Sequence, residues 1–151
     1  MKNINTTRFG TIDIDENKII NFLEGIPAFE TEHEFVIVPY SNDTPFLFLQ
    51  SVKTPSLAFL MVDPFSFFGD YEFTIDDDVL DKLKIEKQED ILTFSFLTVH
   101  DGDVKKTTAN LLAPIIINQN NCQGIQLILE NTGYTTRHKL ADDEKKTGDD
   151  E

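Results

Sequence analysis

Histidine and cysteine are the side chains most often used to bind metals or to act as nucleophiles, and this chain holds three histidines and one cysteine. The histidines are His33, His100 and His138, and none lies four residues from another. This spacing does not predict a zinc site, although carboxylates flank two of them. Cys122 has no histidine near it in the sequence, which favours an unreactive thiol over a nucleophile. We therefore predict no bound metal.

Paired carboxylates are a second group that can do chemistry, because two of them can act as acid and base on a glycosidic bond. Asp76 and Asp77 form such a pair, but they open a predicted helix, where capping and the helix dipole explain both. The sequence holds no serine-nucleophile elbow, phosphate-binding loop, H-E-x-x-H or paired C-x-x-C motif. We therefore predict a protein that is not an enzyme and that uses no cofactor.

Phenylalanine is abundant, with 13 among 151 residues, and three of these side chains gather in one turn. Phe65, Phe67 and Phe68 follow Asp63-Pro64, which stops a strand because proline has no N–H for a sheet ladder. Two interpretations stay open. The rings either close one end of the core, or at least one stays exposed as an anchor for a partner. We expect all three at one rim, with at least one substantially exposed.

The stretch that carries this turn is predicted to be strand, aromatic turn and strand. Residues 57–62 (LAFLMV) are almost continuously apolar, which is typical of a strand buried on both faces. Residues 71–75 (YEFTI) alternate between apolar and polar, which is typical of a half-buried strand. The two strands would hold the aromatic turn between them.

Short strands joined by turns are predicted over most of the remaining chain. Further strands are predicted over residues 4–9, 11–14, 18–22, 35–39, 46–50, 91–99, 115–117 and 125–129. Such close spacing favours antiparallel sheet closed into a barrel or a sandwich. We therefore predict a mainly β fold, a small antiparallel β-barrel-like domain with one short α-helix.

The helix is predicted over residues 76–85, as the only one of more than two turns. Val79, Leu80 and Leu83 recur at helical spacing, so this face should lie against the sheet. Three carboxylates then project toward water, those of Asp77, Asp78 and Asp81. We expect them near the aromatic turn, where apolar anchors beside fixed charge would form a partner-binding surface.

Acidic residues dominate the charge of the chain, whose formal net charge is −14. Residues 13–34 hold seven acids against one lysine, residues 70–90 nine against three, and residues 141–151 six against two. Acid at this density repels phosphate backbones and anionic membranes, so we expect neither nucleic acid nor membrane as a direct partner. It would attract a basic protein, although solubility alone also explains such a composition.

Length and composition predict one folded domain in the cytoplasm. Hydrophobic residues make up 40% of 151 residues, enough for a real core. No apolar run approaches 18 residues, the first ten residues hold no secretory core, and a single cysteine suits a reducing compartment. We expect a single domain over residues 1–140 and a disordered acidic tail over residues 141–151.

Four blocks of the sequence resemble the flagellar assembly factor FliW family. They are EGIPAFE at residues 24–30, VDPFSFFGDYEF at 62–73, TANLLAPIIIN at 108–118 and YTTRH at 134–138. Their order is that of the family, and the likeness runs from about residue 4 to residue 140. The chain departs from the family's pattern at Leu23, Ala28 and Lys139, where proline, glycine and proline are expected. These departures affect a loop and the end of the domain and leave the central block unchanged.

The resemblance implies a small, non-enzymatic, β-barrel-like protein of the bacterial cytoplasm. Proteins similar to it bind newly made flagellin near its C-terminal helix. They also bind the RNA-binding translational regulator CsrA and stop it from silencing flagellin mRNA. Flagellin that accumulates would occupy the factor and free the regulator. An acidic composition fits a basic partner, because opposite charges speed association.

We expect the aromatic turn to bind flagellin, and the helix carboxylates to bind the basic regulator. Two alternatives stay open. A small-ligand-binding β-barrel would have a deep apolar pocket with a few inward polar groups. A general secretion chaperone would bind its cargo without a regulatory role.

Overall fold

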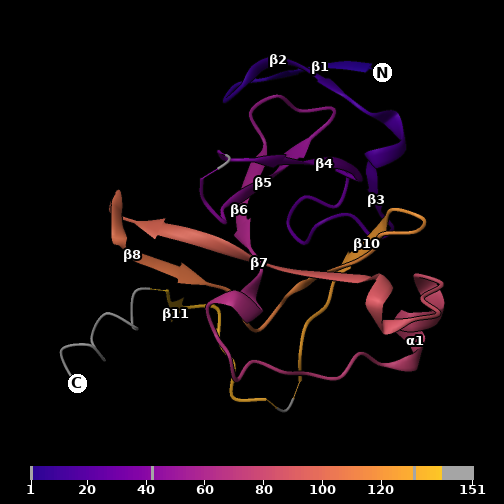
Figure 1. Cartoon of the computed structure of the whole chain (residues 1–151), viewed down its shortest axis with the longest axis vertical. Helices are drawn as coiled ribbons and strands as arrows, with labels where there is room; N and C mark the ends of the chain where they lie inside the picture. Colours follow the sequence, from indigo (N-terminus) through magenta and orange to yellow (C-terminus); the bar gives the residue numbers. More distant parts are fainter. Residues whose placement is uncertain (1, 42, 131, 141–151) are drawn as a thin grey trace.

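Figure 1 shows the computed structural model of the chain, in which residues 2–41, 43–130 and 132–140 are described. These residues are mainly β, as predicted. The strands are β1 (Lys2–Thr6), β2 (Gly10–Ile14), β3 (Ile20–Phe22), β4 (Glu34–Pro39), β5 (Leu47–Ser51), β6 (Ala58–Val62), β7 (Ile91–His100), β8 (Asp103–Ala109), β9 (Ile115–Asn118), β10 (Gln123–Gln126) and β11 (His138–Lys139). The same residues form α1 (Asp77–Lys82) and the 3₁₀ turns η1 (Glu16–Lys18), η2 (Pro64–Ser66) and η3 (Gln88–Asp90).

Seven strands close into a barrel in the order β7-β6-β5-β4-β3-β10-β9, because β9 pairs with β7 as well as with β10. Neighbours in this ring are antiparallel except β10 and β3, which run parallel. The sequence predicted antiparallel pairing throughout. One such pair is unavoidable, because strand directions cannot alternate all the way around a closed ring of seven strands. β8 and β11 continue the sheet beyond the ring on the far side of β7 (Figure 1).

Aromatic and branched aliphatic side chains fill the barrel interior. Phe22 and Phe35 are fully buried and meet edge to face, with ring centroids 5.5 Å apart. The end of β6 confirms the prediction of a strand buried on both faces, whereas its first three residues are half-buried. Met61 packs in the barrel interior, Val62 packs in a second cluster outside it, and both are fully buried.

A hairpin of β1 and β2 covers the outside of β4. Ile4 and Ile14 are buried against Val36, which points out of the barrel because its neighbour Phe35 points in. β3 starts only at Ile20, since η1 precedes it, so the predicted strand over residues 18–22 is shortened at its start.

Residues 71–75 do not form the predicted strand. Burial alternates along them as expected, with Tyr71 buried and Glu72 exposed, but no described strand pairs with the segment. A side chain holds the backbone instead. The Glu72 N–H donates to the Tyr134 hydroxyl at 3.1 Å, and this hydroxyl lies 3.2 Å from the Glu72 carbonyl, to which it donates.

The helix is shorter than predicted, because α1 has six residues, fewer than two turns. Lys84 has a φ of 56°, a left-handed conformation that ends a helix. The buried amide of Asn118 donates to the Leu83 carbonyl at 2.8 Å and to the Lys84 carbonyl at 3.2 Å. These bonds satisfy carbonyls that a longer helix would have paired internally.

Two strands were missed, and the strands predicted over residues 4–9, 18–22 and 125–129 each extend beyond the strand found there. β8 carries Lys105 and Lys106 and lies outside the barrel, so it has little of the apolar alternation that marks a core strand. β11 has two residues, too few for any pattern. The strand predicted over residues 125–129 ends at Gln126 in β10. Beyond it, the N–H groups of Leu127 and Leu129 donate to the carbonyls of Pro114 and Leu112, which lie outside the strands.

Ala28 stands in a loop with a φ of 74°, a region that favours glycine. The resemblance places glycine at this position in the family. Replacing Ala28 by glycine is therefore expected to raise the free energy of unfolding by about 0.5–1 kcal/mol, because the left-handed strain of alanine exceeds the added entropy of glycine. Urea unfolding would measure the change. Ala58→Gly in β6 is the control, expected to lower stability, and a loss of stability in Ala28→Gly would contradict the prediction.

No helix within the described residues is long and apolar enough to cross a membrane. The tail that the sequence predicts to be disordered, residues 141–151, lies outside the described residues. The assignment of residues 1–140 to a single domain stays a prediction.

Candidate functional site

The aromatic turn is built by η2, directly after the fully buried Val62. The Asp63 carboxylate accepts from the Phe65 N–H at 2.9 Å, and Pro64 occupies the first position of the turn. Both features favour the start of a helical turn. The Phe68 N–H then donates to the Pro64 carbonyl at 2.8 Å. The chain therefore bends sharply and points successive phenylalanines in different directions.

Phe65 is the exposed member of the three, with 45% of its surface accessible. Its ring lies 5.6 Å from Tyr71 and stacks on Phe73 at 6.4 Å between centroids. Phe65 therefore rests on an aromatic base and still faces water. This confirms that at least one of the three phenylalanines is substantially exposed.

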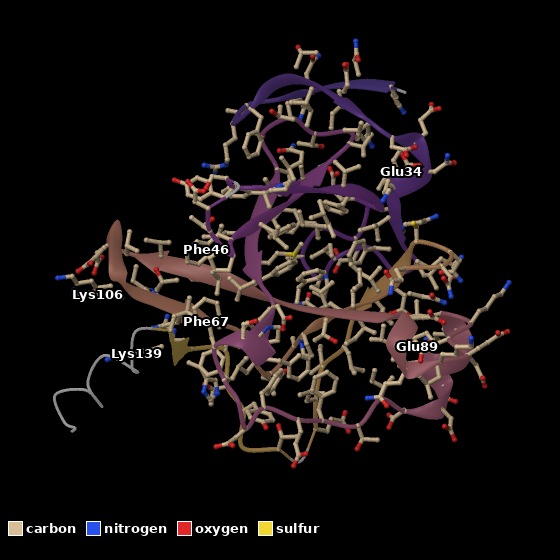
Figure 2. The ribbon with its side chains drawn as sticks, in the orientation of Figure 1. Glu34, Phe46, Phe67, Glu89, Lys106 and Lys139 are labelled. Carbon is tan, nitrogen blue, oxygen red and sulfur yellow. The ribbon has the colours of Figure 1, made fainter. Side chains whose placement is uncertain are left out.

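Phe67 and Phe68 are half-buried and pack into the cluster that also holds Val62 and Tyr71. Phe67 stacks on Phe46, with centroids 6.4 Å apart (Figure 2). Phe68 meets the imidazole of His138 edge to face at 6.0 Å. These two rings serve the core more than the surface. Core closure therefore describes Phe67 and Phe68, and exposure describes Phe65. The role of Phe65 as an anchor for a partner stays a prediction.

Tyr71 fixes the base of the aromatic surface, which we define as Phe46, Phe65, Phe67, Phe68 and Phe73. Its hydroxyl donates to the Leu111 carbonyl at 2.8 Å, and its ring meets Tyr134 edge to face at 4.7 Å. Burial raises the pKa of Tyr71 well above that of a free tyrosine, and the neighbouring Tyr134 raises it further. The Tyr71 hydroxyl is thus a neutral, structural donor at physiological pH.

The three predicted carboxylates of the helix are exposed, those of Asp77, Asp78 and Asp81. Val79 and Leu83 on the opposite face are buried against Ile116 and Ile125 of β9 and β10, and Leu80 is half-buried. The predicted apolar stripe is therefore confirmed. Lys82 of α1 pairs with Glu24 at 2.8 Å, and this hydrogen bond raises the pKa of Lys82.

Phe73 connects the aromatic surface to the helix. It stacks on Phe65 and also packs against the cluster that contains Val79 and Leu83. Sequence reasoning did not single out Phe73 as a site residue, although its alternation with Tyr71 was the available signal. The ring thus lies between the aromatic turn and the buried face of α1, which is opposite the three carboxylates. That the carboxylates and the turn form one partner-binding surface stays a prediction.

A polar hollow of about 670 Å³ adjoins this connection. One side is formed by residues 72–76, and the other by residues 127–130 with Thr132. Carboxylates line it, those of Glu72, Asp76 and Glu130, and Ile128 beside them is 59% exposed. No sequence pattern placed residues 127–130 beside residues 72–76, because the two segments meet only through the barrel topology.

A second hollow, the mouth groove, lies at the end of the barrel where β3 and β7 begin and where β4 and β9 end. It has a volume of about 600 Å³. Its walls are mainly apolar and come from Ile12, Ile20, Ile37, Val38, Leu92 and Ile117. The charged side chains on it are Asp13, Asp15 and Lys18, and Cys122 also lines it. Sequence analysis missed the mouth groove, since five separate segments meet there.

The histidines are not brought together. His33 lies 2.7 Å from the Phe22 carbonyl, His100 lies 2.9 Å from the Thr108 hydroxyl, and His138 accepts from the Thr135 N–H. Within the described ranges, no three histidine, cysteine, aspartate or glutamate side chains gather in a way that could hold a metal ion.

The sequence as a whole is similar to proteins of known family. A sequence model of the family described as FliW protein matches residues 3–140. The flagellar assembly factor FliW of Geobacillus sp. (strain WCH70) is 48% identical over 137 residues, which cover 91% of this chain and 94% of that protein. The flagellar assembly factor FliW of Bacillus subtilis (strain 168) is 44% identical over 137 residues, covering 91% and 95%.

The fold is similar as well. A crystal structure of the flagellar assembly factor FliW matches with a TM-score of 0.85 and 44% sequence identity. The match covers 92% of this chain and 96% of the chain in the crystal. It therefore spans the barrel, the aromatic surface and α1 together.

Proposed function

Because this chain belongs to the FliW family of flagellar assembly factors, we propose that it binds flagellin and antagonises the translational regulator CsrA. In this proposal the protein is a non-catalytic binding protein of the bacterial cytoplasm. Free protein holds CsrA away from flagellin mRNA. Flagellin that accumulates occupies the protein and releases CsrA, so flagellin synthesis follows flagellar assembly.

The observation that carries the proposal is the exposure of Phe65 on an aromatic base of buried Tyr71 and half-buried Phe73. Protein interfaces concentrate binding energy in a few large side chains at the centre of a well-packed patch. Phe65 is 45% exposed, yet Tyr71 and Phe73 restrict its ring. A ring that is already ordered loses little entropy when a partner covers it. We assign the flagellin contact to Phe65 and its neighbours for this reason.

The carboxylates of α1 support a basic second partner. Asp77, Asp78 and Asp81 are exposed, and the docked face of the helix fixes their direction. Opposite charges at the rim of an interface accelerate encounter with a basic surface. A negative body bound beside an RNA-binding surface also raises the cost of bringing phosphates near it. We assign the CsrA contact to these carboxylates.

The double substitution Asp77→Lys with Asp78→Lys is expected to slow association with CsrA by about tenfold at low salt, because it reverses charge where encounter is steered. The rate should also lose most of its dependence on ionic strength, and flagellin binding should stay unchanged. Stopped-flow association at low and high salt measures both effects.

The matched control is Asp142→Lys with Asp143→Lys, which changes the net charge by the same amount. The sequence predicts that these residues belong to a disordered tail, and charge away from an interface is screened beyond about 8 Å. This variant, and a chain that ends at Leu140, should therefore associate almost as fast as the parent. Equal rates for the α1 variant and the parent would mean that these carboxylates only maintain solubility.

The mouth groove favours a second candidate, a small-ligand-binding barrel. It is apolar, has a volume of about 600 Å³ and lies at a barrel mouth, where ligands often bind. Few polar groups converge on it, and its position on the surface also suits a protein segment. Only the CsrA assay distinguishes a general secretion chaperone from the main proposal, because such a chaperone would bind its cargo but not CsrA.

A further inference from the structure

We propose that the mouth groove is a strand-addition site, which accepts an extended apolar segment flanked by lysine or arginine from a partner protein. This inference rests on the proposed function only in taking the chain to be a protein-binding one. It concerns a surface separate from the aromatic surface and from the exposed face of α1.

The first observation is an unpartnered flank of β4. β5 pairs with β4 along its full length, from Phe35 to Pro39. β3 pairs with β4 only at Glu34 and Phe35, because the chain before Ile20 turns away into η1. Among the described residues, β4 beyond Phe35 is therefore paired on one side only. The other side faces the mouth groove, whose lining includes residues 36–39 of β4.

The second observation is the direction of the backbone groups at Ile37. The Tyr40 N–H donates to Phe46 and the Val52 N–H donates to Glu34, so even-numbered residues of β4 form the hydrogen-bonded pairs with β5. In an antiparallel ladder the backbone groups of alternate residues point to opposite sides. The N–H and the carbonyl of Ile37 therefore point toward the flank that β3 leaves open. An extended segment placed there would pair with both groups.

The third observation is the apolar wall that faces this flank. Ile12, Leu92 and Ile37 are only half-buried and line the groove together with buried Ile20 and Ile117. In a strand, alternate side chains point to the same side. A segment that pairs with Ile37 would thus direct every second side chain into an apolar hollow. Such pockets beside an open strand provide specificity in strand addition, while the main chain provides affinity.

Charge selects the flanking residues of the partner. Asp13 and Asp15 are exposed on the wall formed by β2 and the turn after it, and Lys18 is the cation among the lining residues. They belong to residues 13–34, which hold seven acids against one lysine. A segment that carries lysine or arginine on both sides of its apolar core fits this rim, whereas an acidic one is repelled.

Synthetic peptides test the site without flagellin or CsrA. The probe is an eight-residue peptide of alternating valine and threonine with a lysine at each end. One control replaces the lysines by glutamate, and another carries N-methyl groups that remove the backbone donors on one edge. We expect the lysine peptide to slow amide exchange at Ile37 and alkylation of Cys122, which is the single cysteine and lines the groove. Each control peptide should bind about tenfold more weakly, the loss expected for one or two hydrogen bonds or charge contacts.

Two protein variants make the test specific. Ile12→Lys removes an apolar wall residue and adds a positive charge, so it should weaken binding of the lysine peptide by about tenfold or more. Val104→Lys is the matched control. It makes the same change in charge at a side chain that is 73% exposed on β8, outside the barrel, and it should leave the affinity unchanged.

Several results would overturn the inference. One is equal binding of the N-methylated peptide, since strand pairing needs its donors. A second is amide exchange at Ile37 that the lysine peptide leaves unchanged. A third is an equal loss of peptide affinity in Ile12→Lys and Val104→Lys. Protection of Cys122 by a fatty acid but not by peptides would make the groove a small-ligand site. Protection of Cys122 that rises with protein concentration, without any added peptide, would make the mouth groove a contact between copies of this chain. If the peptides bind as expected while flagellin and CsrA do not, the proposed function fails and this inference stands.

Discussion

Phe65→Ala is expected to weaken flagellin binding by about 30-fold, a loss of about 2 kcal/mol, while the protein stays folded. Phe65 is the exposed ring of the aromatic turn, and its base of Tyr71 and Phe73 remains in place when the ring is removed. Its truncation should lower the free energy of unfolding by about 1 kcal/mol, because nearly half of the side chain is already in water. Titration calorimetry and urea unfolding of the same variant separate the two effects.

Two other phenylalanines serve as controls for Phe65. Phe29 is 40% exposed and contacts Phe59, a residue of the barrel interior, so Phe29→Ala matches the substitution in type and exposure. It should leave flagellin binding unchanged. Phe22 is fully buried, and Phe22→Ala should cost about 3–5 kcal/mol of stability. An equal loss of flagellin binding in Phe65→Ala and Phe29→Ala would contradict the assignment of the aromatic surface.

Leu83→Ala is expected to lower the free energy of unfolding by about 2–5 kcal/mol, because a fully buried leucine leaves a cavity. Leu83 follows α1 and packs with Val79 on β9 and β10. Its carbonyl also accepts from Asn118 and Asn121, so the helix end and the β9–β10 turn are held at one point. Loss of the side chain should loosen both and free the carboxylates of α1 from their fixed direction.

The functional consequence should be selective. In the fraction that stays folded, CsrA association should slow and flagellin binding should persist. Leu80→Ala is the control on the same helix. Because Leu80 is only half-buried, this substitution should lower the free energy of unfolding by less than Leu83→Ala does. Urea unfolding with hydrogen exchange across α1 measures the change. A cost for Leu83→Ala as small as that for Leu80→Ala would show that the helix is not anchored as described.

Sequence patterns correctly predicted the elements in which the spacing of apolar residues within one segment determines which side chains are buried. The apolar run at residues 57–62 became β6, with Met61 and Val62 buried on opposite faces. The spacing of Val79 and Leu83 predicted the docked face of α1. An aromatic turn after Asp63-Pro64 predicted an exposed ring, and Phe65 is that ring.

Other features depend on what lies beside a segment in space, and sequence patterns do not report this. Alternation along residues 71–75 correctly predicted which side chains are buried, but it cannot reveal whether a strand is available for pairing. The extent of α1 was overestimated because Asn118, distant in sequence, ends it. The mouth groove forms where five segments that are separate in sequence meet. The role of Phe73 depends on its stacking with Phe65, a contact that the sequence pattern does not predict.

In the proposed function, this protein removes CsrA from flagellin mRNA, and flagellin reverses the removal. Fluorescence anisotropy of a labelled flagellin leader RNA, bound to purified CsrA and titrated with this protein, tests it directly. We expect release of the RNA in the absence of flagellin and renewed RNA binding when flagellin is added. RNA that stays bound to CsrA at saturating amounts of folded protein would contradict the proposed function.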